Sequence, residues 1–468
     1  MFAAPAIPAA PQLPPADSHP DYGFRHGLSL THGWLPVTVQ VLAVVVLAVA
    51  IGWRTRRWRL VWLPVCALFG AAGAVAAWAY MNDQGLASDP APGPLWVCVG
   101  ATVAALAVVV LGWRGARWWR RGIALLAVPL ALLSTGIVLN QWVGYYPTVQ
   151  AAWNALTAGP LPHQTELAAL PALRGTNVGD GRIVPVRIPD AGSGFPHRTE
   201  YVYLPPVWFT GATPPALPVV MMIAGEFNTP ADWLRSGQIM PELDRFTAAN
   251  GGRAPILVFV DSSGSFNNDT ECVNGPRGDA ADHLTKDVPG YVESRFGATA
   301  DPARWAVVGW SMGGTCAVDL AVMHPELLHT FIDIAGDIGP SSGTKEQTIQ
   351  RLFGGDAERW AAFDPRTVMA AHGGYTGMAG LFDDLAPQRT GRQRPASGAA
   401  TGLGGRGGYD TGETGAAEKL CDQAKTVGID CTVHTSQGGH TWQFAAAAFT
   451  SSLPWLVGRV GMPVPDTA

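Results

Sequence analysis

Charged residues are scarce in this chain of 468 residues: Asp, Glu, Lys and Arg together make up 14% of it, against about a quarter in ordinary globular domains. The net charge of −5 gives no reason to expect nucleic acid as a partner. The six cysteines form no CxxC or Cys/His pattern that would bind zinc, and no metal or organic cofactor is expected. The 18 tryptophans, by contrast, are many. Low charge and abundant tryptophan together indicate a membrane portion.

Four long apolar runs near the N-terminus contain no charged residue: 35–53, 60–80, 95–113 and 122–143. Each is close to the ~20 residues that a helix needs to cross the hydrocarbon core. The runs are apolar all round, which argues against buried core helices of a soluble protein. Because they hold no ionisable group, no ion or proton pathway is predicted. We therefore expect four transmembrane helices within 35–144, preceded by a flexible extracytoplasmic arm, 1–34.

The loops between these runs predict the orientation of the bundle. The loops after the first and third runs each contain four arginines, whereas the loop at 81–94 has two aspartates and no basic residue. Loops rich in arginine or lysine stay in the cytoplasm. The sequence thus predicts a multi-pass protein of the cell membrane in which everything after about residue 144 is extracytoplasmic.

Beyond a linker at 145–178, short apolar runs alternate with helical stretches. Runs of alternating polarity at 182–188 and 199–204 predict a pair of antiparallel strands. Further strands are expected at 217–224, 256–260, 305–308, 331–335, 377–382 and 431–435, with helices at 230–250 and 280–296. Alternating strands and helices indicate a mostly parallel sheet covered on both faces. The Gly/Arg/Ser-rich segment 386–415 is expected to form a long mobile loop.

The pentapeptide Gly309-Trp310-Ser311-Met312-Gly313 lies between the strand at 305–308 and a helical run at 315–323. Strand, turn and helix in this order make G-x-S-x-G a nucleophile elbow, in which a sharp turn lifts the serine hydroxyl above the sheet. The alternative is an ordinary Gly/Ser-rich turn. The antiparallel entry, the parallel units and the elbow together predict an α/β hydrolase domain over 179–460, behind the transmembrane bundle.

A serine hydroxyl needs an adjacent base, and the base needs a third group that orients it. In α/β hydrolases these follow the serine in the order acid, then histidine. His440, beside two glycines in a loop after the strand at 431–435, is the predicted base of Ser311. His434 falls within that strand, and His372 comes too early in the chain.

Two adjacent carboxylates, Asp383 and Asp384, follow the strand that precedes the glycine-rich loop. Successive residues of an extended chain point to opposite sides, so only one of them can face the histidine. Asp383 is preferred and Asp384 is the alternative. Asp410 and Glu413, within the glycine-rich loop, are weaker candidates.

An oxyanion hole in this fold uses the N–H of the residue after the nucleophile and a second N–H from the loop after an earlier strand. The first donor is therefore Met312. The strand at 217–224 leads into Gly225-Glu226-Phe227, so the second donor is predicted to be the N–H of Glu226 or of Phe227. An acidic side chain at this position is unusual for an anion site.

Four segments at 261–269, 283–291, 309–314 and 438–442 resemble, in order and spacing, the putative-esterase family, which includes esterase D and the secreted antigen 85 mycolyltransferases. The resemblance spans roughly 180–458. It implies Ser311 as nucleophile, His440 as base, the N–H of Met312 in the oxyanion hole, and Asp261 near bound acceptor hydroxyls. The mycolyltransferases use a glutamate as the acid, which has no clear match here, so Asp383 rests on its position alone.

The resemblance also bears on the cysteines outside the apolar runs. In the family the loop that holds Cys272 approaches the nucleophile helix, where Cys316 lies, while Cys421 is on the helix before the strand that holds Cys431. Disulfides Cys272–Cys316 and Cys421–Cys431 are therefore predicted, in keeping with a domain outside the cytoplasm.

These features predict a membrane-anchored serine esterase or acyltransferase. Its substrate is expected to be an acyl ester of a lipid or glycolipid, and the acyl group would pass to water or to a sugar hydroxyl. One alternative is a non-catalytic envelope protein that keeps the fold to bind glycolipid or a partner. Another makes the four-helix bundle a lipid-handling module with an esterase attached. The oligomeric state is not indicated.

Overall fold

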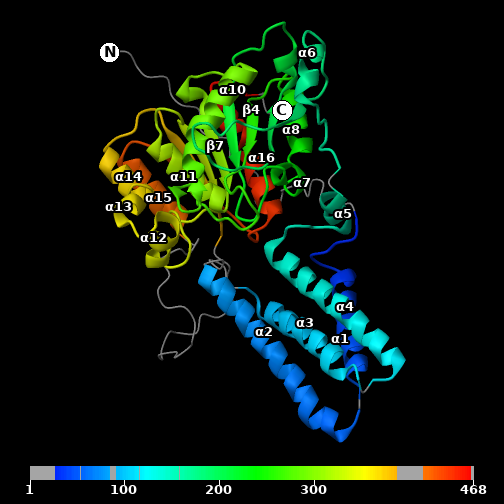
Figure 1. The fold of residues 1–468 in the computed structure, drawn as a ribbon. Helices are drawn as coiled ribbons and strands as arrows, with labels where there is room; N and C mark the ends of the chain where they lie inside the picture. Colours follow the sequence, from blue (N-terminus) through cyan, green and yellow to red (C-terminus); the bar gives the residue numbers. More distant parts are fainter. Residues whose placement is uncertain are drawn as a thin grey trace, which may run out of the picture.

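The computed structural model describes residues 27–52, 54–84, 91–114, 116–157, 159–386 and 415–464. A bundle of four long helices lies below an α/β domain in the view of Figure 1. Most of the predicted N-terminal arm, 1–34, lies outside the described residues. The predicted loop at 386–415 does too, apart from its two end residues, and so do Asp410 and Glu413 within it.

The four long helices correspond to the four apolar runs. They are α1 (Trp34–Ile51), α2 (Leu63–Gln84) with a π-helical turn before it (Trp58–Trp62), α3 (Gly93–Gly112) and α4 (Trp118–Val143). All four are long and apolar enough to cross a membrane. Many of their apolar side chains face outward, as in Val97 and Val110, which are 71% and 72% exposed. Outward apolar side chains are expected of helices whose solvent is lipid.

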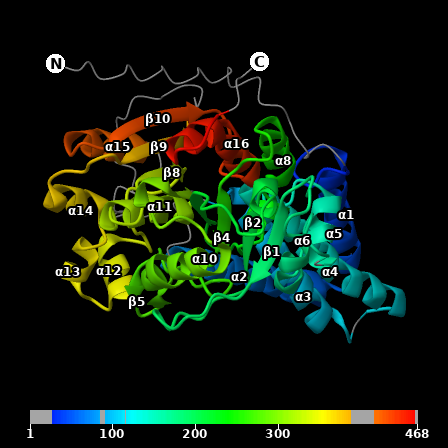
Figure 2. The same cartoon turned by 90° about the horizontal axis from the view of Figure 1, so that it is seen from above.

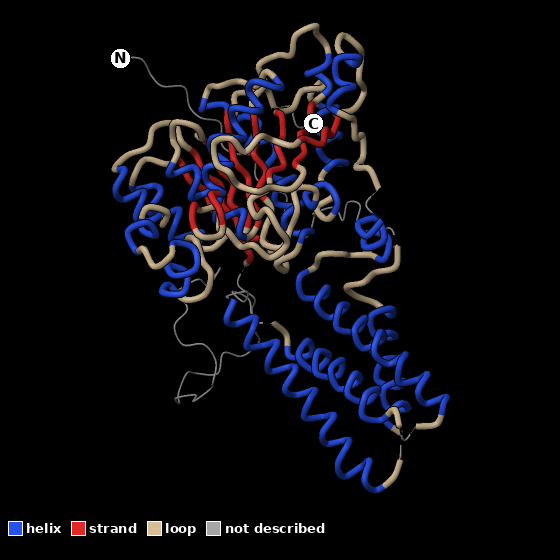
Figure 3. Tube along the Cα trace, in the orientation of Figure 1, coloured by secondary structure: helices blue, strands red, loops and turns tan. Residues whose placement is uncertain are grey.

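The sheet of the α/β domain has eight strands in the order β1-β2-β4-β3-β7-β8-β9-β10. Strand β2 pairs antiparallel with both β1 and β4, and every other pair is parallel. The strands are β1 (Arg182–Val186), β2 (Glu200–Leu204), β3 (Val219–Ile223), β4 (Ile256–Val260), β7 (Trp305–Trp310), β8 (Thr330–Ile334), β9 (Ala379–Leu385) and β10 (Asp430–Ser436). A two-residue hairpin, β5 (Asn274–Gly275) and β6 (Gly278–Asp279), stands apart. The predicted mostly parallel sheet with an antiparallel entry is confirmed, as are its flanking helices (Figure 3).

Helices cover both faces of this sheet (Figure 2). One face packs against α10 (Val288–Phe296), α11 (Met312–Met323) and α15 (Ala416–Thr426). The other packs against α7 (Asp232–Arg235), α8 (Met240–Ala249) and α16 (Trp442–Arg459). The inner strands β3 and β4 are apolar at every position because both of their faces are buried. The site residues therefore have to come from the strand ends and the loops beyond them.

Several helices differ from those predicted. The helix expected at 230–250 is two, α7 and α8, which break near Gly237; a Cβ there would lie 2.7 Å from the carbonyl oxygen of Trp233. The predicted stretch at 280–296 is α9 (Ala280–Asp282), a π-helical turn (His283–Asp287) and α10. The linker at 145–178 contains α5 (Val149–Thr157) and α6 (Leu170–Leu173). Short 3-10 turns complete the fold at Leu167–Ala169, Pro206–Phe209 and Pro302–Arg304.

Three helices between β8 and β9 were not predicted: α12 (Lys345–Phe353), α13 (Ala357–Ala361) and α14 (Pro365–His372). Each has an N-cap residue whose side chain accepts hydrogen bonds from backbone N–H groups of the first turn. These residues are Thr344, Asp356 and Asp364, respectively. Such N-cap residues satisfy backbone donors that a helix end leaves unpaired. These N-cap residues were therefore the sequence signal from which the three short helices could have been predicted.

The end of α4 contacts the α/β domain directly. Tyr145 Oη donates a 2.6 Å hydrogen bond to Asp232 Oδ2, and Tyr145 packs against the core on the α16 side of the sheet. Burial and the Asp232 carboxylate raise the pKa of the Tyr145 phenol, which keeps it a donor. At Gly144 a Cβ would lie 2.4 Å from Thr441 Cγ2. The bundle thus meets the α/β domain at the loop that carries His440.

Candidate active site

The turn around Ser311 has the geometry of a strained elbow. Ser311 follows β7, has φ 59° and ψ −125°, and directly precedes α11. A non-glycine residue with positive φ is uncommon, and such strain gathers at functional sites. A Cβ at Gly309 would lie 1.6 Å from the carbonyl oxygen of Gly313, and one at Gly313 would lie 2.4 Å from that of Ile223. Both glycines are therefore required by the close approach of backbone.

His440 reaches this serine. Its Nε2 lies 2.9 Å from Ser311 Oγ, although 129 residues separate the two in the chain. The imidazole packs on the ring of Trp310, with centroids 4.2 Å apart. Thr441, the next residue, caps α16 by accepting a hydrogen bond from the backbone N–H of Phe444. The cap and the tryptophan hold the imidazole at hydrogen-bonding distance from the hydroxyl, as a base that activates a serine requires.

The other two histidines weighed as bases lie elsewhere. His434 is on β10, opposite Asp383 in the register, and burial lowers the pKa of its imidazole. His372 ends α14 and stacks on Tyr375.

The two candidate acids are neighbours near the end of β9, and their side chains point to opposite sides of the sheet. Asp383 shares its side with Leu381, which packs in the core that contains Trp310 and Trp442. This is also the side of the histidine that packs on Trp310. Burial, and then the charge of Asp384, raise the pKa of Asp383 to about 7. Asp384 Oδ1 accepts a 2.7 Å hydrogen bond from the N–H of Leu385.

The described contacts of the His440 imidazole, with Ser311 Oγ and with the ring of Trp310, do not identify the acid. The identity of the acid therefore stays a prediction, and the alternation of side chains along β9 favours Asp383.

Changing Asp383 to Asn is expected to lower kcat for ester hydrolysis by roughly 10³- to 10⁴-fold, because an amide cannot stabilise the imidazolium that forms during attack. Asp384→Asn is the matched control and should cost less than about tenfold. Steady-state kinetics on both variants would decide between them. If neither variant is impaired, Asp410 and Glu413 become the next candidates for the acid.

The backbone N–H of Met312 lies at the first turn of α11, whose twelve residues direct a positive helix end toward the serine. The second predicted donor lies in a tight turn, in which the N–H of Asn228 donates to the carbonyl of Gly225 at 3.2 Å and Phe227 has φ 64°. A Cβ at Gly225 would lie 3.0 Å from Ser311 Cβ. The turn thus lies against the nucleophile, and the choice between Glu226 and Phe227 as donor stays a prediction.

The side chain of Glu226 is compatible with an anion site. Burial, and then the charge of Asp269, raise the pKa of Glu226 to about 8. Near neutral pH the carboxyl is therefore largely protonated and does not repel an oxyanion. Because this pKa is raised on folding, its contribution to stability is complete below the unfolded pKa and is lost as the pH rises through about 8.

Asp261 forms an internal ion pair with Arg198. It is 1% exposed, and both of its oxygens accept hydrogen bonds from the Arg198 guanidinium at 2.6 and 2.9 Å. The backbone N–H groups of Ser263 and Gly264 donate to the same carboxylate. These contacts hold the pKa of Asp261 below its usual range despite its burial. The role near acceptor hydroxyls that the family resemblance implies for Asp261 stays a prediction.

Arg198 was not singled out in the sequence. Its Nη2 donates a 2.8 Å hydrogen bond to the carbonyl of Asn228, at the end of the turn that lies over Ser311. The ion pair with Asp261 thereby fixes a loop of the site. A single arginine before a strand carries no signal in sequence, so only the fold reveals this contact.

Both predicted disulfides are present, Cys272–Cys316 and Cys421–Cys431. The first ties a loop to the nucleophile helix α11, and the second ties α15 to β10, the strand before the His440 loop. Each therefore braces an element that carries a site residue.

One cluster has the residue types of a metal site: His197, Glu200 and His283, with ligand atoms within 4.8 Å of one another. Glu200 accepts from His283 Nε2 at 3.1 Å, and His197 Nδ1 lies 3.4 Å from its other oxygen. The two imidazoles stack at 4.5 Å with a 19° angle between their planes. Nearly parallel rings cannot both aim an in-plane lone pair at one ion between them. We therefore interpret the cluster as a buried ion-pair network.

A family model described as Putative esterase matches residues 196–456. The chain belongs to the Putative esterase family. Over 438 residues it is 28% identical to an uncharacterized protein of Corynebacterium glutamicum, covering 92% of this chain and 96% of that one. That match extends well beyond the esterase region and so includes the four-helix segment. The membership inferred from the four sequence segments is thereby confirmed.

Solved structures are similar to part of this chain. An S-formylglutathione hydrolase from Agrobacterium tumefaciens is 18% identical, covers 61% of this chain and 97% of its own, and has a TM-score of 0.46. A ferulic acid esterase is 16% identical, with coverage of 60% and 99% and a TM-score of 0.43. MPT51 of Mycobacterium tuberculosis is 18% identical, with coverage of 59% and 97% and a TM-score of 0.36.

Proposed function

We propose that this member of the esterase family is a membrane-anchored serine esterase or acyltransferase that acts on ester-linked acyl groups of lipids or glycolipids. The observation that carries the proposal is the 2.9 Å approach of His440 Nε2 to Ser311 Oγ at a strained elbow. A hydroxyl in this position loses its proton to the imidazole as it attacks, which turns a weak nucleophile into an effective one.

In the first half-reaction Ser311 Oγ attacks the ester carbonyl carbon while its proton moves to His440 Nε2. The carbonyl π electrons move to the oxygen, and the resulting oxyanion is stabilised by the N–H of Met312 and an N–H of the turn at 225–228. When the tetrahedral intermediate collapses, the ester C–O bond breaks and His440 gives its proton to the departing alcohol. The product is an acyl-serine, and Asp383 holds the imidazolium during these steps.

In the second half-reaction a hydroxyl of water or of a sugar attacks the acyl-serine. Its proton passes to His440, the bond to Ser311 Oγ breaks, and the serine recovers a proton from the imidazolium. Water gives a free acid, whereas a sugar hydroxyl gives a new ester. The same groups serve both outcomes, so the proposal includes hydrolysis and acyl transfer.

Four long apolar helices support a membrane anchor. The arginine-rich loops at 54–59 and 114–121 support an orientation in which the catalytic domain is outside the cytoplasm. An enzyme tethered beside the bilayer meets lipid substrates at high local concentration, which favours lipidic esters as substrates.

Labelling with a membrane-impermeant fluorophosphonate probe tests this proposal. Intact cells that carry the wild-type protein should be labelled, and cells that carry Ser311→Ala should not. Labelling that requires lysis of the cells would contradict the outward orientation. If the wild-type protein stays unlabelled even after lysis, the serine is not activated and the non-catalytic binding function would replace the enzymatic one.

A further inference from the structure

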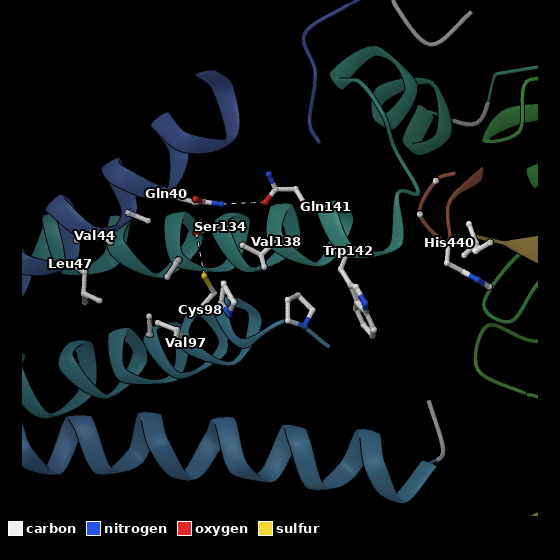
Figure 4. A pocket seen from close by; sticks show the side chains of 18 of the residues that line it. Gln40, Val44, Leu47, Val97, Cys98, Ser134, Val138, Gln141, Trp142 and His440 are labelled. Atoms are coloured by element: carbon white, nitrogen blue, oxygen red, sulfur yellow. Dashed lines mark hydrogen bonds between the residues drawn. The ribbon is translucent and has the colours of Figure 1, made fainter. Parts of the chain in front are cut away.

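A cavity of about 1210 Å³ joins the four-helix bundle to the candidate active site. Its walls come from α1, α3 and α4, from the end of β9, and from the loop that carries His440 (Figure 4). Small-molecule sites usually enclose about 300–1,000 Å³. The cavity is therefore large enough for a substrate, and most of its length lies among helices that are apolar enough to span a membrane.

Helices α1 and α4 each turn one face toward this space. On α1 the lining residues include Val44 and Leu47, and on α4 they include Ser134, Val138 and Trp142. Spacings of three and four residues place side chains on the same side of a helix. From Ala131 to Trp142 the lined part of α4 extends for about 16 Å at 1.5 Å per residue. The cavity is thus elongated along the helices.

Helix α3 completes the wall with Val97, Cys98 and Ala101, again at spacings of one helical face. Polar atoms are few along it. Cys98 Sγ and Ser134 Oγ contact each other at 3.8 Å, and Gln40 Nε2 and Gln141 Oε1 lie 3.5 Å apart. Among the described residues that line the cavity there is no Asp, Glu, Lys or Arg. A space lined in this way suits a long apolar chain.

The other end of the cavity reaches the loop that carries His440. Leu385 and Ala386, Gly438, Gly439 and His440 line it there. His440 Nε2 lies 2.9 Å from the nucleophile oxygen. The two glycines present no side chain that would close the passage between the membrane helices and the imidazole.

We propose that this cavity binds the acyl chain of a membrane-resident ester lipid, so that the chain lies between α1, α3 and α4 while the ester carbonyl reaches Ser311. The inference rests on the proposed esterase function and extends it. The four-helix bundle is then part of the substrate site as well as an anchor. Long-chain donors can enter from the bilayer without crossing water, and chains that fill the cavity are favoured over short ones.

Large side chains placed in the cavity test the inference. The double variant Val44→Trp with Val97→Trp narrows it from α1 and α3, at positions that are 68% and 71% exposed and so have room for tryptophan. The matched control is Val45→Trp with Val110→Trp, on the same two helices at positions that are 51% and 72% exposed and lie outside the cavity lining. Both pairs add the same apolar volume to the same two helices, and only the first pair adds it inside the cavity.

The measurement is the ratio of kcat/KM for p-nitrophenyl palmitate to that for p-nitrophenyl butyrate, with full-length protein in detergent micelles. The cavity variant should lower this ratio by more than about tenfold, because even one methylene in an apolar pocket is worth tenfold or more. The control should leave the ratio within about twofold of wild type. An unchanged ratio in the cavity variant, or an equal loss in the control, would overturn the inference.

Crosslinking gives a readout that does not depend on turnover. A palmitoyl ester with a diazirine at the end of its chain is added to vesicles that contain the Ser311→Ala protein, and labelled peptides are mapped by mass spectrometry. Labels on the α1, α3 and α4 faces that line the cavity support the proposal, and labels confined to other lipid-facing positions contradict it. Crosslinking to the cavity without any ester hydrolysis by the wild type would mean that the site binds lipid and that the proposed enzymatic function fails.

Discussion

Replacing Ser311 with alanine is expected to lower kcat for ester hydrolysis by roughly 10⁶-fold, the loss typical of removing a nucleophile that works with a histidine base. The elbow presents this one oxygen to His440 Nε2 at 2.9 Å and to the first turn of α11. Alanine keeps the backbone turn but removes the only atom that can form the acyl-enzyme. The residual rate reflects substrate binding and the backbone donors alone.

Steady-state kinetics with a short soluble ester would measure the Ser311 effect, and near-native thermal unfolding would show that the variant folds. Ser294→Ala is the matched control, because this serine lies on the exposed part of α10 and donates only to the carbonyls of its own helix. It should leave kcat unchanged. A Ser311→Ala protein that retains more than about one per cent of the activity would mean that another residue is the nucleophile.

His440→Ala should lower kcat by about the same factor as the loss of the serine, because the hydroxyl is a poor nucleophile without its base. The two losses should not add. In the double variant kcat is expected to stay within about tenfold of either single variant, since groups that act as a unit are strongly non-additive. The double variant tests whether Ser311 and His440 act together, whereas each single variant tests only one of these residues.

His434→Ala provides the control for the base, six residues earlier on β10 and half-buried. It should keep most of the activity, although the loss of a partly buried ring is expected to lower the melting temperature by a few degrees. Equal losses of activity in His434→Ala and His440→Ala would indicate that disruption of β10, and not removal of the base, causes both effects. A loss of activity in His440→Ala alone would assign the role of base to His440.

Much of this molecule could be predicted because its signals are local. The apolar runs predict helices of membrane-spanning length, and this prediction needs no knowledge of their packing partners because a helix satisfies its own backbone hydrogen bonds. The glycines around Ser311 similarly reflect a constraint within one turn, where a Cβ at Gly309 would overlap the carbonyl of Gly313. The family membership rested on four such segments. Local chemistry was therefore enough for the fold class and for two residues of the candidate site.

Positions that depend on register were only partly predictable. Alternation along β9 placed Asp383 and Asp384 on opposite sides of the sheet, but a strand pattern cannot say which side faces a distant loop. The structure puts Asp383 on the side of Trp310 and Trp442, because β8 and β9 pair with Asp383 opposite Ile334. Asp261 is a different case: the family resemblance marks the residue, but only the structure shows that its carboxylate pairs with Arg198.

The sequence by itself determined that there are four long apolar helices, an esterase domain, a serine elbow and a histidine loop. Only the tertiary structure decided how the two halves meet. Gly144 lies against Thr441, and Tyr145 is hydrogen-bonded to Asp232, so α4 ends at the loop that carries the base. The cavity between bundle and active site follows from that docking. Its walls come from segments hundreds of residues apart. Packing between such segments produces no periodic pattern in the sequence, so the cavity could not be predicted from it.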